Sequence, residues 1–333
     1  MNGKPMAPQI SLGPFQGITD HIYRNLFMTY FGGVDKLYTP FFTGIHKTEA
    51  KNLKGAALDP HLNDTSILVP QILSNDGAEI IRFARFCAKN GFNEINLNMG
   101  CPFPRVARKK RGSGLLPFPE LVEQILSEYY ENPPLKLSIK CRLGYQESTE
   151  INALIPIFNR YPLHEVIIHV RTGKQLYKGI ADQASFAKIK NQLNQIPAYN
   201  GDIFSSDQMI RLQNLLPDVV HFMLGRGLLA DPFLAAEIKG QTYIDKPKIL
   251  KEFLEATFEA RLVETNFALT TLGRMKELWG YLRWSFDDPV NIWRLIRRTN
   301  ALDNYKETVG KVFADFEWKG AGFAQKTNMN LIK

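Results

Sequence analysis

Eight short runs rich in β-forming residues alternate with helical patterns over the first 240 residues of the chain. Strands that alternate with helices pair in parallel through right-handed crossovers. Eight such units predict an α/β fold with a closed (β/α)8 TIM barrel, because a doubly wound open sheet usually has fewer strands. The predicted strands are Ile10–Pro14, Lys36–Pro40, Ser66–Ile72, Glu94–Asn98, Leu135–Lys140, Glu165–Val170, Pro197–Asn200 and Val219–Leu224.

The pattern changes after residue 240, where no further β-rich run occurs. Three helices are predicted there, over Lys248–Val263, Leu269–Trp284 and Ile292–Val312. A chain of 333 residues is too long for one average domain but suits a barrel with an appendage. We therefore predict a catalytic TIM-barrel domain over residues 1–240 and a small C-terminal helical domain over residues 241–333.

Composition restricts the class of protein. The sequence has no apolar run of about 18 residues, so no membrane span is expected. Residues 1–15 lack the apolar core of a secretory signal, and three scattered cysteines give neither a disulfide framework nor zinc spacing. We expect a cytoplasmic monomer without metal. The net charge of +8 favours a polyanionic partner.

Side chains that could carry chemistry follow the carboxyl ends of the predicted strands, where TIM barrels place their active sites. Period-two alternation directs Lys140 and Arg142 toward the barrel axis, and it does the same for Asn98. His169 and Arg171 share one face of the sixth strand. A lysine at this place binds an anion or an electron-rich ring, forms a Schiff base, or pairs with a carboxylate, and Lys140 alone does not decide between them.

Cys101 lies in the loop after the fourth strand, between a glycine and a proline. Cys87 and Cys141 are instead predicted to be packed thiols, because free cysteines are commonly buried. In the loop that follows Cys101, five of the seven residues 105–111 are basic and would repel one another without an anionic partner. These side chains are Arg105, Arg108, Lys109, Lys110 and Arg111.

The seventh and eighth strands are followed by Asn200-Gly201-Asp202 and Gly225-Arg226-Gly227. In TIM barrels these two loops commonly bind phosphate through backbone N–H groups. Glycine allows the backbone to approach the phosphate, and arginine supplies a bidentate countercharge. The two loops predict a phosphorylated cofactor.

Taken in order, the segments at the strand ends resemble the successive motifs of the tRNA-dihydrouridine synthases. The departures are Phe15 and Gln16, where that family often has methionine and a small or acidic residue, and Arg105, where lysine is usual. The matching segments are Pro14-Phe15-Gln16-Gly17-Ile18-Thr19-Asp20, Asn98-Met99-Gly100-Cys101-Pro102, Lys140-Cys141-Arg142-Leu143-Gly144, His169-Val170-Arg171-Thr172 with Gln175, Tyr177, Lys178-Gly179 and Ala181-Asp182, Asn200-Gly201-Asp202-Ile203 and Gly225-Arg226-Gly227.

The resemblance implies an FMN-dependent oxidoreductase that reduces the C5=C6 bond of uridines in tRNA, with NADPH reducing the flavin first. Cys101 is implied to protonate C5 from the face opposite the flavin. The implied contacts of the flavin ring are Pro14, Phe15, Gln16, Gln71, Lys140 and His169. The implied contacts of its phosphate end are Asn200, Gly201, Asp202, Gly225 and Arg226.

A uridine must leave its stack to reach such a site, and contacts to the RNA must offset the cost. We predict that Asn98, Lys140, Arg142 and Arg171 hold the uracil. Basic side chains predicted to bind tRNA are those from Arg105 to Arg111 together with Arg274, Lys276, Arg283, Arg294, Arg297 and Arg298. Trp279, Trp284 and Trp293 are predicted to pack between helices instead.

Three other interpretations stay open from the residues. An FMN barrel reductase acting on a small molecule of the dihydroorotate or enone type shares the barrel, but the basic loop and the helical domain count against it. A Schiff-base aldolase would use Lys140. A catalytically silent tRNA-binding protein would keep the scaffold without using Cys101.

Overall fold

The computed structural model describes residues 7–46, 53, 55–320 and 322–323. The chain divides into two compact units: the strand unit, Met1–Pro14, Asp35–Gly201 and Leu216–Met223, and the helical unit, Phe15–Val34, Asp202–Leu215 and Leu224–Lys333. The predicted domain boundary at residue 240 is not among these limits and stays a prediction, and residues 321 and 324–333 of that domain fall outside the described residues. Within the described ranges no helix is long and apolar enough to cross a membrane.

The strand unit contains a parallel sheet that confirms the predicted barrel. Its strand order is β3-β2-β1-β9-β8-β7-β6-β5-β4, so the two ends of the sheet are strands that follow each other in the chain. All eight predicted strands form, and the described residues contain nine because the third is divided in two. The strands are β1 (Gln9–Leu12), β2 (Lys36–Tyr38), β3 (Leu68–Val69), β4 (Gln71–Ile72), β5 (Glu94–Met99), β6 (Lys136–Gly144), β7 (Glu165–Thr172), β8 (Ile196–Asn200) and β9 (His221–Leu224).

Pro70 divides the third predicted strand, which was expected to run unbroken. Proline has no backbone N–H and cannot donate to a neighbouring strand. The carbonyl of Pro70 still accepts from the Asn96 N–H at 2.9 Å, and the next N–H, of Gln71, donates to the Thr39 hydroxyl at 2.9 Å. The strand therefore changes partners at this residue, with β3 pairing to β2 and β4 to β5.

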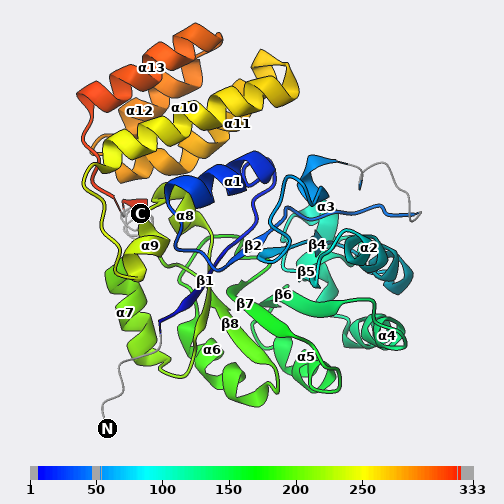
Figure 1. Cartoon of the computed structure of the whole chain (residues 1–333). Coiled ribbons are helices and arrows are strands. Elements are labelled where there is room, and N and C mark those ends of the chain that lie inside the picture. Colours follow the sequence, from blue (N-terminus) through cyan, green and yellow to red (C-terminus); the bar gives the residue numbers. More distant parts are fainter. Residues whose placement is uncertain (1–6, 47–52, 54, 321, 324–333) are drawn as a thin grey trace. The chain divides into compact units, whose positions relative to one another are not determined.

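Helices α2, α4, α5 and α6 lie around the outside of the strands (Figure 1). Asp76 and Asp182 are the N-caps of α2 and α6. Each carboxylate accepts a hydrogen bond from a backbone N–H in the first turn of its helix, at 3.0 and 2.9 Å. The helices of this unit are α2 (Gly77–Lys89), α3 (Pro104–Ala107), α4 (Pro119–Tyr130), α5 (Ile151–Phe158) and α6 (Gln183–Ile189), with 3-10 turns η2 (Ala56–Leu58), η3 (Gly112–Leu115) and η4 (Lys190–Gln192).

A buried charge network occupies the amino ends of the strands, away from the predicted active site. Glu165 accepts from the Tyr38 hydroxyl at 3.1 Å and pairs with His221 at 2.5 Å, while Lys36 pairs with Glu94 at 3.0 Å. Burial alone would raise the pKa of Glu165. The His221 hydrogen bond and the Lys36 charge outweigh burial and lower this pKa below its ordinary value.

The lowered pKa of Glu165 predicts acid sensitivity of the fold. A carboxyl whose folded pKa lies below its unfolded pKa stabilises the fold above the unfolded value, about 4.3. That stabilisation is lost as the pH falls through the folded pKa. We expect Glu165→Gln to cost about 3 to 5 kcal/mol at pH 7, because His221 and Lys36 lose a buried partner. Urea unfolding at pH 7 and pH 4 measures this, and a cost that is equal at both pH values would contradict it.

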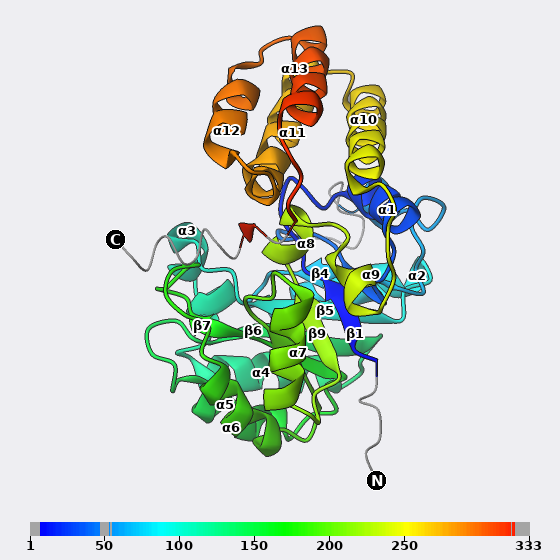
Figure 2. The same ribbon diagram turned by 90° about the vertical axis from the view of Figure 1, so that its left-hand side faces the viewer.

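The helical unit contains the remaining helices, of which α10, α11, α12 and α13 lie together (Figure 2). Trp279 is fully buried among them, and its indole N–H donates to the Tyr305 hydroxyl at 3.0 Å, which confirms its predicted packing role. The helices are α1 (His21–Tyr30), α7 (Ser206–Leu215), α8 (Arg226–Ala230), α9 (Leu234–Ile238), α10 (Lys246–Thr265), α11 (Ala268–Leu282), α12 (Pro289–Arg298) and α13 (Leu302–Asp315), with the 3-10 turn η5 (Arg283–Ser285).

The prediction of one helix over Ile292–Val312 was wrong, because α12 ends at Arg298 and α13 begins at Leu302. Thr299 has an extended backbone conformation, and its hydroxyl donates to the Ile296 carbonyl at 2.8 Å. The Lys276 ammonium also donates to the carbonyls of Arg297 and Thr299. These contacts satisfy carbonyls that a continuous helix would have bonded internally.

Candidate active site

Asn98 holds the start of the Cys101 loop at the carboxyl end of β5. Its side-chain oxygen accepts from the backbone N–H groups of Gly100 and Cys101, at 3.0 and 2.9 Å. Its amide nitrogen donates to Gln71 at 2.7 Å, and Gln71 donates to Asn96 at 2.8 Å. The inward alternation predicted for β5 is confirmed, and it places an amide chain beneath the cysteine.

A second set of contacts closes the loop behind Cys101. The Ser113 backbone N–H and hydroxyl both donate to the Cys101 carbonyl at 3.0 Å. Gly112 has φ +57°, and a Cβ atom there would lie 2.6 Å from the same carbonyl oxygen. Only glycine accommodates both this conformation and this approach. The backbone of Cys101 is therefore fixed at both ends of the loop.

Cys101 differs chemically from the other two cysteines, although all three are free thiols. Cys87 and Cys141 are fully buried, as predicted, whereas Cys101 keeps 7% of its surface exposed. Burial raises the pKa of the Cys101 thiol, and the Phe103 backbone hydrogen bond and the charges of Arg142, Arg105 and Lys140 oppose the rise only in part. Cys101 is therefore a protonated thiol at neutral pH.

Lys140 lies on β6, the strand next to β5. Its ammonium donates to the side-chain oxygen of Asn200 at 3.0 Å, and the Asn200 amide donates to the Met223 carbonyl at 2.8 Å. Burial lowers the pKa of Lys140 to about 8, with a further contribution from the nearby Arg142 charge. The lysine is therefore still cationic at neutral pH and loses its charge a little above it.

Arg142 and Arg171, which were predicted to hold the substrate, are buried and bound to backbone carbonyls. Arg142 donates to Gly100, Thr172 and Leu176 at 2.9, 2.8 and 2.7 Å, so it joins the Cys101 loop to the loop after β7. Arg171 donates to Lys178 and Gly179 at 3.1 and 2.8 Å. These contacts give both arginines a role in shaping the loops, and contact with substrate stays a prediction.

His169 lies beside Arg171, with 3.5 Å between the histidine Nε2 and the guanidinium. The ring of Tyr177 is tilted toward it at 6.0 Å between centroids, and Tyr177 remains 44% exposed. Tyr177 belongs to the segments that carry the family resemblance, but no role was predicted for it. An exposed aromatic ring beside the buried end of β7 is a further candidate for contact with a planar ligand.

The loop after β8 begins with a close backbone approach at Gly201. A Cβ atom there would lie 2.4 Å from the Tyr199 hydroxyl oxygen, so a larger residue would push the loop out of place. Asn200, immediately before it, is almost fully buried, and its side chain makes two hydrogen bonds, with Lys140 and with the Met223 carbonyl. The strand unit thus brings together Gln71, Asn98, Cys101, Lys140, His169, Asn200 and Gly201 at the carboxyl ends of its strands.

In the helical unit, Arg226 begins α8 and pairs with Asp202 at 2.5 Å. Its guanidinium also lies over the rings of Phe204 and Phe323, at 5.5 and 5.3 Å. These contacts fix the guanidinium in place, so the predicted phosphate ligand would meet a preoriented group.

Phe15 and Gln16 belong to the same unit. The Phe15 ring packs edge-on against Tyr281 with 5.6 Å between centroids. A Cβ atom at Gly225 would lie 3.1 Å from this ring, so the ring and the Gly225 backbone are in close contact. Gln16 is exposed, and Pro14 is half-buried at the end of the strand unit. The structure therefore brings Phe15, Gly225 and Tyr281 together in one cluster.

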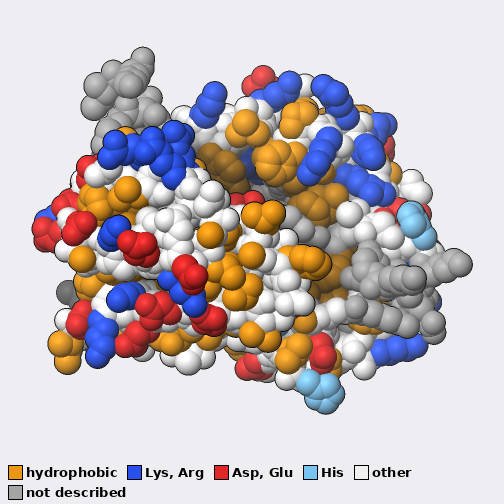
Figure 3. Space-filling model, turned by 90° about the horizontal axis from the view of Figure 1, so that it is seen from above, with side chains coloured by type: hydrophobic (Ala, Val, Ile, Leu, Met, Phe, Trp, Pro, Cys, Tyr) orange, Lys and Arg blue, Asp and Glu red, His pale blue; other side chains and the backbone are white. Residues whose placement is uncertain are grey.

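The basic residues after Cys101 fall into two groups. Arg111 is bound within the fold, since it donates to Asn75 at 2.9 Å and lies 3.5 Å from Glu79. The other four are exposed, and the neighbouring Phe103 is 59% exposed. Figure 3 shows one face of the molecule with Lys and Arg side chains in blue. The four exposed residues are Arg105, Arg108, Lys109 and Lys110.

The predicted basic residues of the helices also divide. Arg294, Arg297 and Arg298 are exposed on α12. Arg274 instead pairs with Asp20 at 3.0 Å, Lys276 donates to two carbonyls at the end of α12, and Arg283 donates to the Pro289 carbonyl at 3.1 Å. The α12 set is the better candidate surface for an anion. Within the described ranges no group of three or more His, Cys, Asp and Glu side chains could hold a metal ion.

Comparison with known proteins gives consistent matches. Residues 11–309 match the family described as Dihydrouridine synthase (Dus). The tRNA-dihydrouridine(16) synthase of Neisseria meningitidis serogroup B is 27% identical over 95% of this chain and 97% of its own length. The tRNA-dihydrouridine synthase B of Pasteurella multocida is 29% identical over 73% and 72% of the two chains.

Two solved structures share the fold at low sequence identity. Histamine dehydrogenase from Rhizobium sp. 4-9 has a TM-score of 0.50 and 11% identity, over 75% of this chain and 48% of its own. Morphinone reductase has a TM-score of 0.50 and 8% identity, over 72% and 87%. At this level of identity the similarity concerns the fold alone.

Proposed function

This chain belongs to the dihydrouridine synthase family, and from that premise we propose that it reduces uridines in tRNA to 5,6-dihydrouridine with flavin as cofactor. The observation that carries the proposal is the place of Cys101, a free thiol at the carboxyl end of β5 on a loop held by Asn98 and Ser113. Uracil reduction needs an acid that protonates C5. A thiol that stays protonated at neutral pH and can still donate fits that need.

The residues present fit FMN. The Lys140 ammonium suits the N1–C2=O edge of a flavin, which carries negative charge when reduced. Asn98, whose side-chain amide donates to Gln71, is proposed to hold the uracil. Ring contacts are proposed for Pro14, Phe15, Gln16, Gln71, Lys140 and His169, and phosphate contacts for Asn200, Gly201, Asp202, Gly225 and Arg226.

When bound, reduced FMN would supply the hydride for C6 of the uracil, with NADPH as the source of the reducing equivalents. The protein residues have separate tasks. Cys101 delivers its proton to C5, and the Asn98 contacts hold the backbone that carries the thiol. Lys140 places a positive charge where negative charge accumulates. Arg142 and Arg171 keep the surrounding loops closed.

The tRNA is proposed to meet the exposed residues Arg105, Arg108, Lys109 and Lys110 and the α12 arginines. These contacts would offset the cost of moving a uridine out of its stack, a few kcal/mol. Phosphate contacts of this kind make affinity fall with salt. The protein is proposed to act as a monomer.

Charge reversal in the basic loop tests this tRNA contact. We expect Arg108→Glu, Lys109→Glu and Lys110→Glu together to weaken tRNA binding by at least about tenfold and to reduce the slope of log K against log salt by about 3. The matched control reverses three exposed residues elsewhere in the strand unit, Arg85, Lys89 and Lys188. Binding measured over a salt series decides, and equal slopes for both triple variants would remove the loop from the interface.

The activity itself is tested by incubating the protein, FMN and NADPH with unmodified tRNA and measuring dihydrouridine by mass spectrometry. Dihydrouridine at defined positions supports the proposal. Turnover of a small enone without turnover of tRNA would favour the small-molecule reductase. Trapping of Lys140 by borohydride in a protein that binds no flavin would favour the aldolase. Tight tRNA binding without reduction would leave a binding protein.

A further inference from the structure

The loop after β1 contains a tight turn over residues Phe15–Asp20, which is fixed from within. The Thr19 hydroxyl accepts from the Phe15 N–H at 2.8 Å, and the N–H groups of Ile18 and Thr19 donate to the Phe15 carbonyl at 3.1 and 3.0 Å. Both polar backbone groups of Phe15 are thus bound to the far end of the turn. A displacement of residues 18–20 would therefore also displace Phe15.

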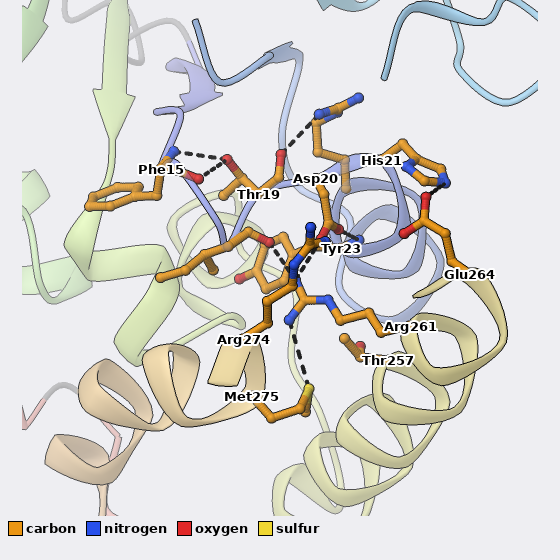
Figure 4. Close-up of polar contacts among 12 residues, drawn as sticks. Phe15, Thr19, Asp20, His21, Tyr23, Thr257, Arg261, Glu264, Arg274 and Met275 are labelled. Atoms are coloured by element: carbon orange, nitrogen blue, oxygen red, sulfur yellow. Dashed lines mark hydrogen bonds and ion pairs between the residues drawn. The ribbon is translucent and has the colours of Figure 1, made fainter. Parts of the chain in front are cut away.

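Two buried arginines, Arg261 and Arg24, hold the far end of the Phe15–Asp20 turn, and Figure 4 shows Arg261 together with Asp20. Arg261 of α10 is fully buried and donates to the Ile18 carbonyl at 2.6 Å, and Arg24 of α1 donates to the Thr19 carbonyl at 2.9 Å. Arg261 also pairs with Asp20 at 3.1 Å. Two successive carbonyls of one turn are therefore fixed by guanidinium groups from two helices.

Asp20 joins these contacts into one network. One of its oxygens accepts from the Tyr23 N–H at 2.9 Å and caps α1, and the other pairs with both Arg261 and Arg274. Arg261 reaches further to the Met275 sulfur at 3.7 Å. Helices α1, α10 and α11 therefore all meet the turn at the Asp20 carboxylate, which caps α1 and forms ion pairs with Arg261 of α10 and Arg274 of α11.

Stability alone does not account for an arginine at position 261. A buried charge is costly to desolvate, and apolar residues of similar volume often replace a buried ion pair without loss of stability. The Nε of Arg261 has no hydrogen-bond partner among the described residues, so the side chain gives up one donor while its Nη atoms reach the turn and Met275. What the arrangement provides is a defined position for the Phe15–Asp20 turn.

We propose that Arg261 is a positioning residue, which fixes the Phe15–Asp20 turn so that Phe15 and Gln16 are presented to bound flavin. This inference rests on the flavin site proposed above. Phe15 lies against Gly225 and Tyr281, so a small shift of the turn changes how its ring packs. Loss of the Arg261 contacts therefore acts on flavin binding rather than on tRNA binding.

The test is Arg261→Lys, which keeps the charge but puts one ammonium on a shorter side chain in place of the planar guanidinium, whose Nη2 contacts Ile18 and Asp20 and whose Nη1 contacts Met275. We expect FMN to bind on the order of tenfold more weakly, the absorbance band of the bound flavin to shift, and kcat to fall, while KM for tRNA stays within about twofold. The matched control is Arg82→Lys, which changes a guanidinium that donates to the Ile45 carbonyl at 3.0 Å in the strand unit. The control is expected to keep the wild-type FMN affinity.

Wild-type FMN affinity and spectrum in folded Arg261→Lys would overturn the inference. If this variant does not fold, Arg274→Met is the second test, because Arg274 contacts only the Asp20 carboxylate of the turn and is part-exposed. We expect about threefold weaker FMN binding for it, and unchanged affinity would equally overturn the inference. Failure of the wild-type protein to bind FMN would instead overturn the proposed function.

Discussion

Replacement of Cys101 by alanine is expected to abolish reduction of tRNA while leaving flavin binding intact. The thiol is the only cysteine of the three with exposed surface, and general acid catalysis contributes about 10²- to 10⁴-fold to a rate. We therefore expect kcat to fall by that range, with FMN affinity within about twofold of wild type. Single-turnover formation of dihydrouridine measures the loss.

The chain offers matched controls for this variant. Cys87→Ala and Cys141→Ala remove buried thiols and are expected to lower stability without a comparable loss of turnover. Cys101→Ser keeps the size of the side chain, but a hydroxyl is a far weaker acid, so it is expected to be nearly as inactive as the alanine variant. Full turnover in Cys101→Ser or Cys101→Ala would remove this residue from the mechanism.

Replacement of Lys140 by methionine is expected to have the second largest effect, a loss of kcat on the order of 10²-fold. The dependence of the wild-type rate on pH gives a further prediction. The pKa of Lys140 is lowered to about 8 by burial, so the residue is charged below that pH and neutral above it. The rate should therefore fall as the pH rises through about 8, if the cation is what the reaction needs.

Lys140→Arg separates charge from shape in this prediction. Arginine keeps its charge at all accessible pH values, so the decline above pH 8 should disappear even if the maximal rate is lower. Rates of flavin reduction and of tRNA reduction, measured from pH 6 to 10, show whether the reaction depends on the charge at position 140 or on the shape of the side chain. An unchanged decline in Lys140→Arg would assign it to another group.

Much of the fold could be predicted because its signals are local. Alternation of strands with helices gave every strand, and period-two alternation gave the inward direction of Asn98 and Lys140. The break at Pro70 and the end of α12 at Arg298 were missed. Both depend on partners that are distant in the chain, such as Thr39 for the Gln71 N–H and Lys276 for the last carbonyls of α12.

The candidate site shows the same limit. Cys101 could be singled out because its position after a strand and its basic neighbours are both visible in the sequence. The use of Arg142, Arg171 and Arg111 could not be, since a basic side chain looks the same whether it meets RNA or a backbone carbonyl. Only the structure shows that these three are bound within the fold.

The loop that carries Cys101 is bound by Asn98 at its start, by Ser113 behind it and by Arg142 from the side. An acid on a loop that is held at three places can move little toward its substrate. The uridine must therefore move to the thiol. The residues that bind and orient the RNA then determine which uridine is modified. Evolution of a new target position would accordingly alter the outer basic residues and spare the sulfur and its supports.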